Sequence, residues 1–204
     1  MSKQNTWLYK HVDIQNLAEI QNEFLAILNK YHSDWFSDSW TPNKFCDLSL
    51  ETVMREATAY SDFIRKLGLH SRWHSSYFAT VNSGNNNNNQ WVVHVDDKDS
   101  NYLSYALNLP ILNCEDSYTV WYDVKPDSEK IGWVKHYENV PCFLPEDIIK
   151  EIGRMPATQS AFVNISIPHR PEVMHNNPRI VLTTRFKPEL HDYDFDRLEF
   201  TIDR

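Results

Sequence analysis

Residues 91–96 read WVVHVD, an apolar run that ends in an imidazole and a carboxylate two positions apart. Side chains alternate along an extended strand, so His94 and Asp96 point to the same side of it. The next four residues read DKDS, which indicates that the strand ends here and that a polar loop begins. The two side chains are therefore predicted to lie at the mouth of a strand.

A second imidazole ends a comparable strand further along the chain. Residues 161–169 read AFVNISIPH, so His169 follows an apolar run. Two imidazoles and one carboxylate can occupy one face of an octahedral metal, which leaves three adjacent positions open, as in non-haem Fe(II) oxygenases. Arg179 lies ten residues after His169 and could hold a carboxylate such as the distal one of 2-oxoglutarate through its planar guanidinium. We predict a metal site formed by His94, Asp96 and His169, with Arg179 as the carboxylate clamp.

The composition predicts one folded domain in a reducing compartment. The chain has 204 residues, 41% of them hydrophobic, and a formal net charge of −8 at pH 7. The basic residues are scattered, which disfavours binding to nucleic acid or to an anionic membrane by bulk charge. No apolar run approaches the roughly 18 residues of a membrane span, and the 3 cysteines form no CxxC pair. We expect a cytoplasmic single domain over residues 1–204, with helical support in 1–70 and a β core in 71–204.

Two amphipathic helices are predicted in the N-terminal part. Apolar residues recur at helical spacing over about 14–29, and Asp13 is a candidate cap for the start of this helix. A second helix is predicted over about 50–67, with Ser49 at the capping position and Gly68 after the last turn. These helices are expected to brace a sheet.

The periodicity changes after residue 68, where short segments rich in aromatic and β-branched residues alternate with turn-forming clusters. This pattern predicts a sandwich or barrel of antiparallel strands. One short helix is predicted at about 145–153, with Ile149 and Ile152 among the residues of its buried side. Residues 35–42 are expected to be an aromatic loop and residues 85–89 a solvated asparagine loop. The predicted strands are 73–81, 90–95, 105–112, 118–124, 132–137, 161–167 and 180–186.

The sequence resembles the 2-oxoglutarate- and Fe(II)-dependent oxygenases of the double-stranded β-helix, or jelly-roll, type. The resemblance is carried by the HVD triplet at 94–96, by the strand at 105–113 and by the block at 164–180, and it covers roughly 77–186. It is greatest to the aspartyl/asparaginyl β-hydroxylase-like and prolyl-hydroxylase-like branches. It implies a mainly β jelly roll braced by two or three helices, with Fe(II) as the metal and 2-oxoglutarate as the co-substrate.

The co-substrate site implied by the resemblance departs from the family at one position. Many relatives have a serine or threonine two residues after the arginine, but this chain has Val181. Thr183 and Asn108 are candidates to replace the missing hydroxyl, and we assign Asn108 with Arg179 to co-substrate binding. Asn108 could equally be a buried amide that satisfies loop backbone. Tyr105 and Trp121 are candidates for the pocket lining, although aromatic residues on strands are more often core residues.

A rival pair lies six residues further along, because His175 also has an arginine, Arg185, ten residues after it. We favour His169 because it directly follows an apolar strand, whereas His175 lies among polar residues in a predicted turn. No catalytic residue beyond the metal ligands is expected.

The predicted function is hydroxylation of a C–H bond in an amino-acid, peptide or protein side chain, with succinate and CO₂ as co-products. A small metabolite is the second substrate class. The alternative is a metal-binding, cupin-like module without catalysis, because a jelly roll alone does not determine function. Arg179 favours the enzyme, since a simple metal-binding module needs no arginine there.

Overall fold

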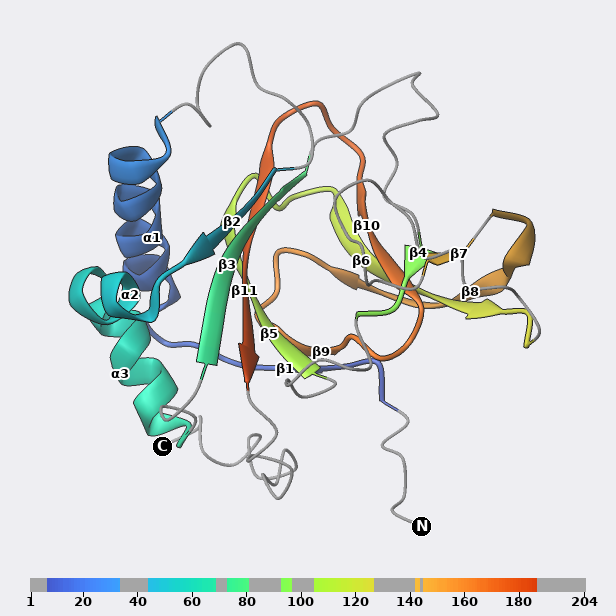
Figure 1. Cartoon of the computed structure of the whole chain (residues 1–204), viewed down its shortest axis with the longest axis horizontal. Helices are drawn as coiled ribbons and strands as arrows, with labels where there is room; N and C mark the ends of the chain where they lie inside the picture. The colour runs from blue at the N-terminus through green and yellow to red at the C-terminus, as the bar shows by residue number, and fades with distance from the viewer. Residues whose placement is uncertain are drawn as a thin grey trace.

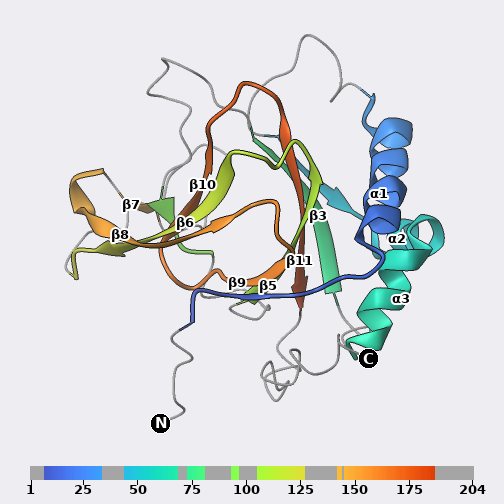
Figure 2. The ribbon, with the colours of Figure 1, turned by 180° about the vertical axis from the view of Figure 1, so that it is seen from behind.

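Two antiparallel β-sheets face each other, and three helices of the described chain pack on the outer side of the larger sheet (Figures 1 and 2). The computed structural model describes residues 7–33, 44–68, 73–80, 93–96, 105–126, 142–143 and 145–186. The larger sheet has the strand order β1-β9-β5-β11-β3-β2, and the smaller has the order β7-β4-β10-β6-β8. From β3 to β11 the chain crosses repeatedly between the sheets, which is the jelly-roll arrangement. The predicted fold class is therefore confirmed.

The helices are α1 (Leu17–Tyr31), α2 (Leu50–Glu56) and α3 (Thr58–Lys66), and a short 3₁₀ helix spans Pro145–Asp147. The strands of the larger sheet are β1 (Tyr9–His11), β2 (Lys44–Leu48), β3 (Trp73–Thr80), β5 (Tyr105–Leu112), β9 (Ala161–Asn164) and β11 (Arg179–Phe186). Those of the smaller sheet are β4 (Val93–His94), β6 (Ser117–Val124), β7 (Cys142–Phe143), β8 (Ile148–Pro156) and β10 (His169–Val173).

The helix termini confirm part of the prediction. The Ser49 hydroxyl accepts a hydrogen bond from the Thr52 amide at 3.1 Å and so caps α2. Gly68 has φ +71°, the left-handed conformation that glycine adopts without steric cost. The cap predicted at Asp13 is wrong, because α1 begins at Leu17 and its N-cap, Asn16, makes no side-chain capping bond.

The second predicted helix is two helices, separated at Ala57, where φ is −120° and ψ is 70°. The break creates a new helix start whose backbone N–H groups need acceptors. Glu23 of α1 supplies them: its carboxylate accepts hydrogen bonds from the Ala59 and Tyr60 amides at 2.8 and 3.2 Å. A side chain from a distant part of the sequence thus stabilises a break that no glycine or proline marks.

The helix predicted at 145–153 is wrong. The segment begins with one 3₁₀ turn and continues as strand β8, which pairs with β6. Ile149 and Ile152, expected on a buried face, are 54% and 42% exposed. Local sequence favours a helix here through its proline and acidic first turn, but pairing with β6 prevails because propensity is weak against tertiary contacts.

Several strand predictions hold with shifted ends. The strand predicted at 161–167 ends at Asn164, whose side-chain oxygen accepts hydrogen bonds from the Ser166 amide and hydroxyl and turns the chain toward the other sheet. Strands β3, β5, β6 and β11 match within one residue, whereas no strand was predicted at β1, β2, β7, β8 or β10. Outside the described residues lie the predicted features at 35–42, 85–89 and 132–137 and the first half, 90–92, of the strand predicted at 90–95.

Strand β11 separates two cores because its side chains alternate between the faces of the larger sheet. Ile180, Leu182 and Phe186 belong to the core between this sheet and the helices. Thr184, on the same face, hydrogen-bonds to Tyr60 and to Ser75. The odd-numbered residues from Arg179 to Arg185 therefore face the space between the two sheets.

The N-terminal strand closes one side of the space between the sheets. Strand β1 pairs with β9, at the edge of the larger sheet, while Leu8 packs against Gly153 of β8 in the smaller sheet. A Cβ at Gly153 would collide with the end of the Leu8 side chain, so the absence of a side chain permits this approach. None of the described helices is long and apolar enough to cross a membrane.

Candidate metal centre

Two neighbouring strands of the smaller sheet bring the predicted ligands together. His94 on β4 and His169 on β10 are directly paired in register, and their ring centroids are 4.7 Å apart. Asp96 follows β4, and its amide donates a hydrogen bond to the Ile165 carbonyl at 3.0 Å. The possible ligand atoms of His94, Asp96 and His169 all lie within 4.8 Å of one another. The structure therefore assembles the three residues that the sequence selected.

In His169 and Asp96, a hydrogen bond to one side-chain atom determines which other atom can bind a metal. His169 Nδ1 lies 2.8 Å from the Ile167 carbonyl, to which it can donate, and this tautomer leaves the Nε2 lone pair available. Asp96 Oδ2 accepts a hydrogen bond from Arg185 Nη2 at 2.7 Å. Its other oxygen, Oδ1, lies 3.6 Å from His94 Nε2. Two nitrogens and one oxygen thus face a common point, and this donor set fits Fe(II).

The protonation states also suit metal binding. Burial and the nearby His94 lower the pKa of His169 to about 4, so this imidazole is neutral at pH 7. Burial alone would raise the pKa of Asp96, but the positive charge of Arg185, together with the two neighbouring histidines, outweighs burial and holds the pKa below its usual value. A neutral imidazole and an ionised carboxylate are the forms that coordinate metals.

The two arginines named from the sequence lie at opposite ends of the inner face of β11. Arg185 is at the metal end, where it pairs with Asp96. Arg179 begins the strand, is 2% exposed and lies near the Cys114 thiol. Burial lowers the pKa of Arg179 and raises that of Cys114. Six residues of extended strand separate the two arginine Cα atoms by about 20 Å.

The two residues of the rival pair, His175 and Arg185, have different surroundings in the structure. His175 is in the turn before β11, where its Nε2 donates a hydrogen bond to the Asn113 carbonyl at 3.1 Å. It is not part of the His94, Asp96 and His169 cluster. Arg185, in contrast, touches that cluster directly, a role that the sequence analysis did not assign to it. The clue was present, because Arg179 and Arg185 have the same parity on one strand.

Asn108 and Thr183 lie between the two arginines. They are cross-strand neighbours on β5 and β11, and both face the space between the sheets. The Asn108 side-chain oxygen is buried and has no hydrogen-bond partner within the described part of the chain. Val181 packs with Cys114 and Ala157 in a small apolar cluster next to Arg179. The inner face therefore changes from apolar at Val181 to polar at Thr183.

The two aromatic candidates for the pocket lining have different positions. Trp121 is fully buried, pairs in register with His169 and donates a hydrogen bond from its indole to the Asn164 carbonyl at 2.8 Å. It forms a rigid wall beside the metal ligands. Tyr105 stacks on Trp7 with ring centroids 4.4 Å apart and packs against the helix-side core, so its predicted place in the pocket is wrong.

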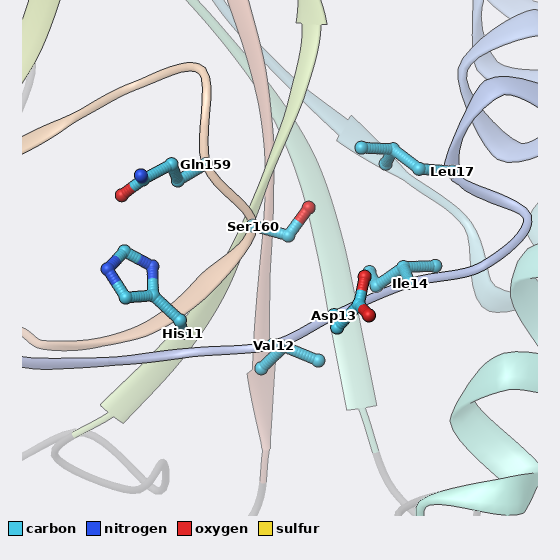
Figure 3. A pocket seen from close by; sticks show the side chains of 7 residues that line it. All are labelled: His11, Val12, Asp13, Ile14, Leu17, Gln159 and Ser160. Atoms are coloured by element: carbon cyan, nitrogen blue, oxygen red, sulfur yellow. The ribbon is translucent and has the colours of Figure 1, made fainter. Parts of the chain in front are cut away.

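A separate cavity of about 250 Å³ lies between the segment that joins β1 to α1 and the loop before β9 (Figure 3). His11, Asp13, Gln159 and Ser160 provide its polar groups, and none of the predicted metal or co-substrate residues lines it. The Ser160 hydroxyl oxygen is buried and therefore does not offer a ligand an open contact. Among the described residues, the side chains that could hold a metal ion gather at His94, Asp96 and His169 and not at this cavity.

Comparison with solved structures supports the fold. No protein-family model and no curated protein matches the chain at the level of sequence. A structure of the epimerase SnoN in complex with Fe³⁺, alpha ketoglutarate and nogalamycin RO is similar, with a TM-score of 0.50 and 15% sequence identity over 88% of this chain and 78% of that one. A second SnoN structure, described as a non-heme alpha ketoglutarate dependent epimerase from nogalamycin biosynthesis, has a TM-score of 0.47 at 15% identity over the same shares. The chain thus has the fold of SnoN, with a candidate His-Asp-His metal site.

Proposed function

We propose that this protein is an Fe(II)- and 2-oxoglutarate-dependent dioxygenase of the double-stranded β-helix superfamily. The observation that carries the proposal is the convergence of His94, Asp96 and His169 on one point, beside a strand with two inward-facing arginines. The fold is that of SnoN, whose structure was solved with Fe³⁺ and alpha ketoglutarate. A module that only bound a metal would gain nothing from a buried arginine on the same strand.

The two arginines suggest how the co-substrate is oriented. Arg185 already has its charge balanced by Asp96, so it belongs to the metal end, where the keto-acid group of 2-oxoglutarate would chelate the ion. Arg179 is buried at the other end of β11, and a carboxylate is the group that its planar guanidinium binds most strongly. The distal carboxylate would therefore point along β11 toward Arg179, past Thr183 and Asn108.

The protein side chains bind, orient and exclude water. With O₂ as the oxidant, a bound Fe(II) and 2-oxoglutarate would supply an oxidative decarboxylation that yields succinate and CO₂ and would enable removal of a hydrogen atom from an unactivated C–H bond. The hydrogen bond to the Ile167 carbonyl fixes the tautomer of His169, and Arg185 fixes the orientation of the Asp96 carboxylate. Trp121 shields this side of the centre from water.

The oxidised substrate is proposed as an amino-acid, peptide or protein side chain, or a small molecule, with hydroxylation as the outcome. The small-molecule class gains support from SnoN, which is described as an epimerase and was solved with nogalamycin RO. The net charge of −8 disfavours a polyanionic substrate.

The decisive experiment measures metal binding, 2-oxoglutarate binding and succinate formation separately. We expect the Mn(II)-loaded protein to bind 2-oxoglutarate in calorimetry and the Fe(II)-loaded protein to release succinate slowly in the presence of ascorbate without added substrate. Screening amino acids, peptides and small metabolites for faster succinate release would then identify the substrate class. Metal binding without 2-oxoglutarate binding would refute the dioxygenase and support the metal-binding module.

A further inference from the structure

A row of polar side chains crosses the inner face of the larger sheet. Thr183 of β11 is directly opposite Asn108 of β5 on one side and Ser76 of β3 on the other. Ser76 is in turn opposite Asp47 of β2, the strand at the edge of this sheet (Figure 1). Residues directly opposite one another in an antiparallel sheet share a face, so all four belong to the face that Thr183 presents to the space between the sheets. The row therefore leads from the central strands to the last described strand of the sheet.

The contacts of β2 confirm that Asp47 faces inward. Its Oδ1 accepts a hydrogen bond from the Ser76 hydroxyl at 2.9 Å. The neighbouring residues Cys46 and Leu48 pack instead with the core between the sheet and the helices. Ser76 is buried, whereas Asp47 is exposed. A buried hydroxyl thus orients a carboxylate that solutes can reach.

Solvent also reaches this face in the middle of the sheet. Most residues of the central strand β11 are buried, but Thr183 and Arg185 are only partly buried, and so is Asn108 on the neighbouring strand. Arg185 pairs with Asp96 of the candidate metal site. The accessible part of the inner face therefore extends from the metal end, past Thr183, to Asp47 at the edge.

The charges along this path favour a cationic ligand at Asp47. Neighbouring strands lie about 4.8 Å apart, so two spacings put the Asp47 Cα about 10 Å from the Thr183 Cα. A bound metal ion would repel a cationic group of a substrate. The separation allows such a group to lie beside a carboxylate while another part of the same molecule reaches the metal end. The net charge of −8 also favours cations over anions.

We propose that Asp47 binds a cationic group, a primary ammonium or a guanidinium, of the substrate that is oxidised at the metal centre. This inference rests on the proposed function and names its substrate class: amines and basic side chains such as that of lysine. The co-substrate would lie along β11 toward Arg179, and the substrate would lie across β3 and β2, so the two leave the metal end in different directions. A charge-assisted hydrogen bond to Asp47 would select this class over neutral molecules of the same length.

L-Lysine and L-norleucine test this site, because norleucine lacks only the side-chain ammonium group. Each is titrated into the Mn(II)-loaded full chain by isothermal calorimetry, with and without 2-oxoglutarate. We expect lysine to bind at least about tenfold more tightly than norleucine. Asp47→Asn, which keeps an acceptor for the Ser76 hydroxyl, should abolish the preference. Asp47→Lys should reverse it and favour L-2-aminoadipate, whose side chain ends in a carboxylate, over lysine. Glu51→Gln is the matched control, because it changes the net charge equally at a side chain on α2 that is 88% exposed.

The outcomes separate the cation site from the proposed enzyme. Equal affinities for lysine and norleucine, no measurable binding of lysine, or a preference that survives Asp47→Asn would overturn the proposal. Far-UV circular dichroism shows whether each variant is folded. Because the preference is also measured without 2-oxoglutarate, a chain that selects lysine through Asp47 but binds no 2-oxoglutarate would support the cation site and refute the dioxygenase. Binding of 2-oxoglutarate without a preference for lysine would have the opposite meaning.

Discussion

The two ends of β11 carry the same kind of side chain in different environments. Arg185, at the metal end, is partly exposed and donates to the Asp96 carboxylate at 2.7 Å. Arg179, at the other end, is 2% exposed, lies near the Cys114 thiol and has a pKa lowered by burial. The first arginine contacts a residue of the candidate metal site, whereas the second is the proposed clamp for the co-substrate carboxylate. The two arginines of β11 therefore differ in their surroundings and not in residue type, and the surroundings determine what each can do.

The largest effect is expected when a candidate metal ligand is removed, and the comparison is with a histidine in the turn before β11. His169→Ala removes one of three ligands, and we expect Fe(II) or Mn(II) affinity to fall by more than roughly 100-fold, because even outer-shell substitutions cost about 10–100-fold. His175→Ala is the control, since it removes only a hydrogen bond to the Asn113 carbonyl. Isothermal calorimetry with Mn(II) measures both. A larger loss in the His175 variant would restore the rival ligand assignment.

The second prediction concerns a substitution that removes the buried charge of Arg179. Arg179→Met keeps the apolar length of the side chain, and we expect 2-oxoglutarate affinity of the Mn(II)-loaded protein to fall at least roughly 30-fold, because truncating one partner of a buried charge pair costs about 2–5 kcal/mol. Metal affinity should not change. Calorimetry with Mn(II) and then with 2-oxoglutarate measures the two affinities, and unaltered 2-oxoglutarate binding would refute the proposed clamp.

The third prediction concerns the other arginine. Arg185→Met releases the Asp96 carboxylate, and we expect metal affinity to fall about 10–100-fold, the usual cost of losing a residue that orients a ligand. This distinguishes it from Arg179→Met, in which only 2-oxoglutarate binding changes. Arg185→Lys should recover part of the loss, because lysine restores the charge without the planar geometry. Equal metal affinity in all three proteins would show that Arg185 does not position Asp96.

The smallest effect is expected when a hydroxyl is introduced at Val181, next to Arg179, where many relatives have a serine or threonine. Val181→Thr preserves side-chain shape and adds one hydroxyl, which we expect to tighten 2-oxoglutarate binding about fivefold, the value of one hydrogen bond of about 1 kcal/mol. Val181→Ala, which only opens space, should not tighten it. The apoprotein should become slightly less stable, because the hydroxyl replaces a methyl group in an apolar cluster with Cys114 and Ala157. Equal affinities of the threonine and alanine variants would argue against a carboxylate at this end.

The clustering of His94, Asp96 and His169 could be predicted from the sequence because its signal is local. His94 and Asp96 share one side of a strand through simple alternation, and His169 ends an equally apolar run. Arg185 was harder to assign, because its contact with Asp96 depends on the distance between the two sheets and not on any spacing in the sequence. The pattern of two inward-facing arginines became evident only once β11 had a register.

The errors in the predicted fold also come from contacts between distant residues. Nothing in the sequence around Ala57 ends a helix, and the break depends on Glu23 of α1. The segment at 148–156 has helical spacing but pairs with β6, and its aliphatic residues were assigned to a buried face that does not exist. Local patterns thus identified the amphipathic helices and the central strands. Tertiary contacts determined where these elements end, and they made a strand of one segment that was predicted to be a helix.

The contact between Leu8 and Gly153 has a consequence for the order in which the chain can fold. Strand β1 is made well before its partner β9, which follows about 150 residues later, and Gly153 is made only shortly before β9. Until then Leu8 and Tyr9 have neither a strand to join nor a surface to cover. During synthesis, this side of the space between the sheets therefore cannot close before β9 is made, and until then the N-terminal segment lacks the strand and the surface that bury it in the finished fold.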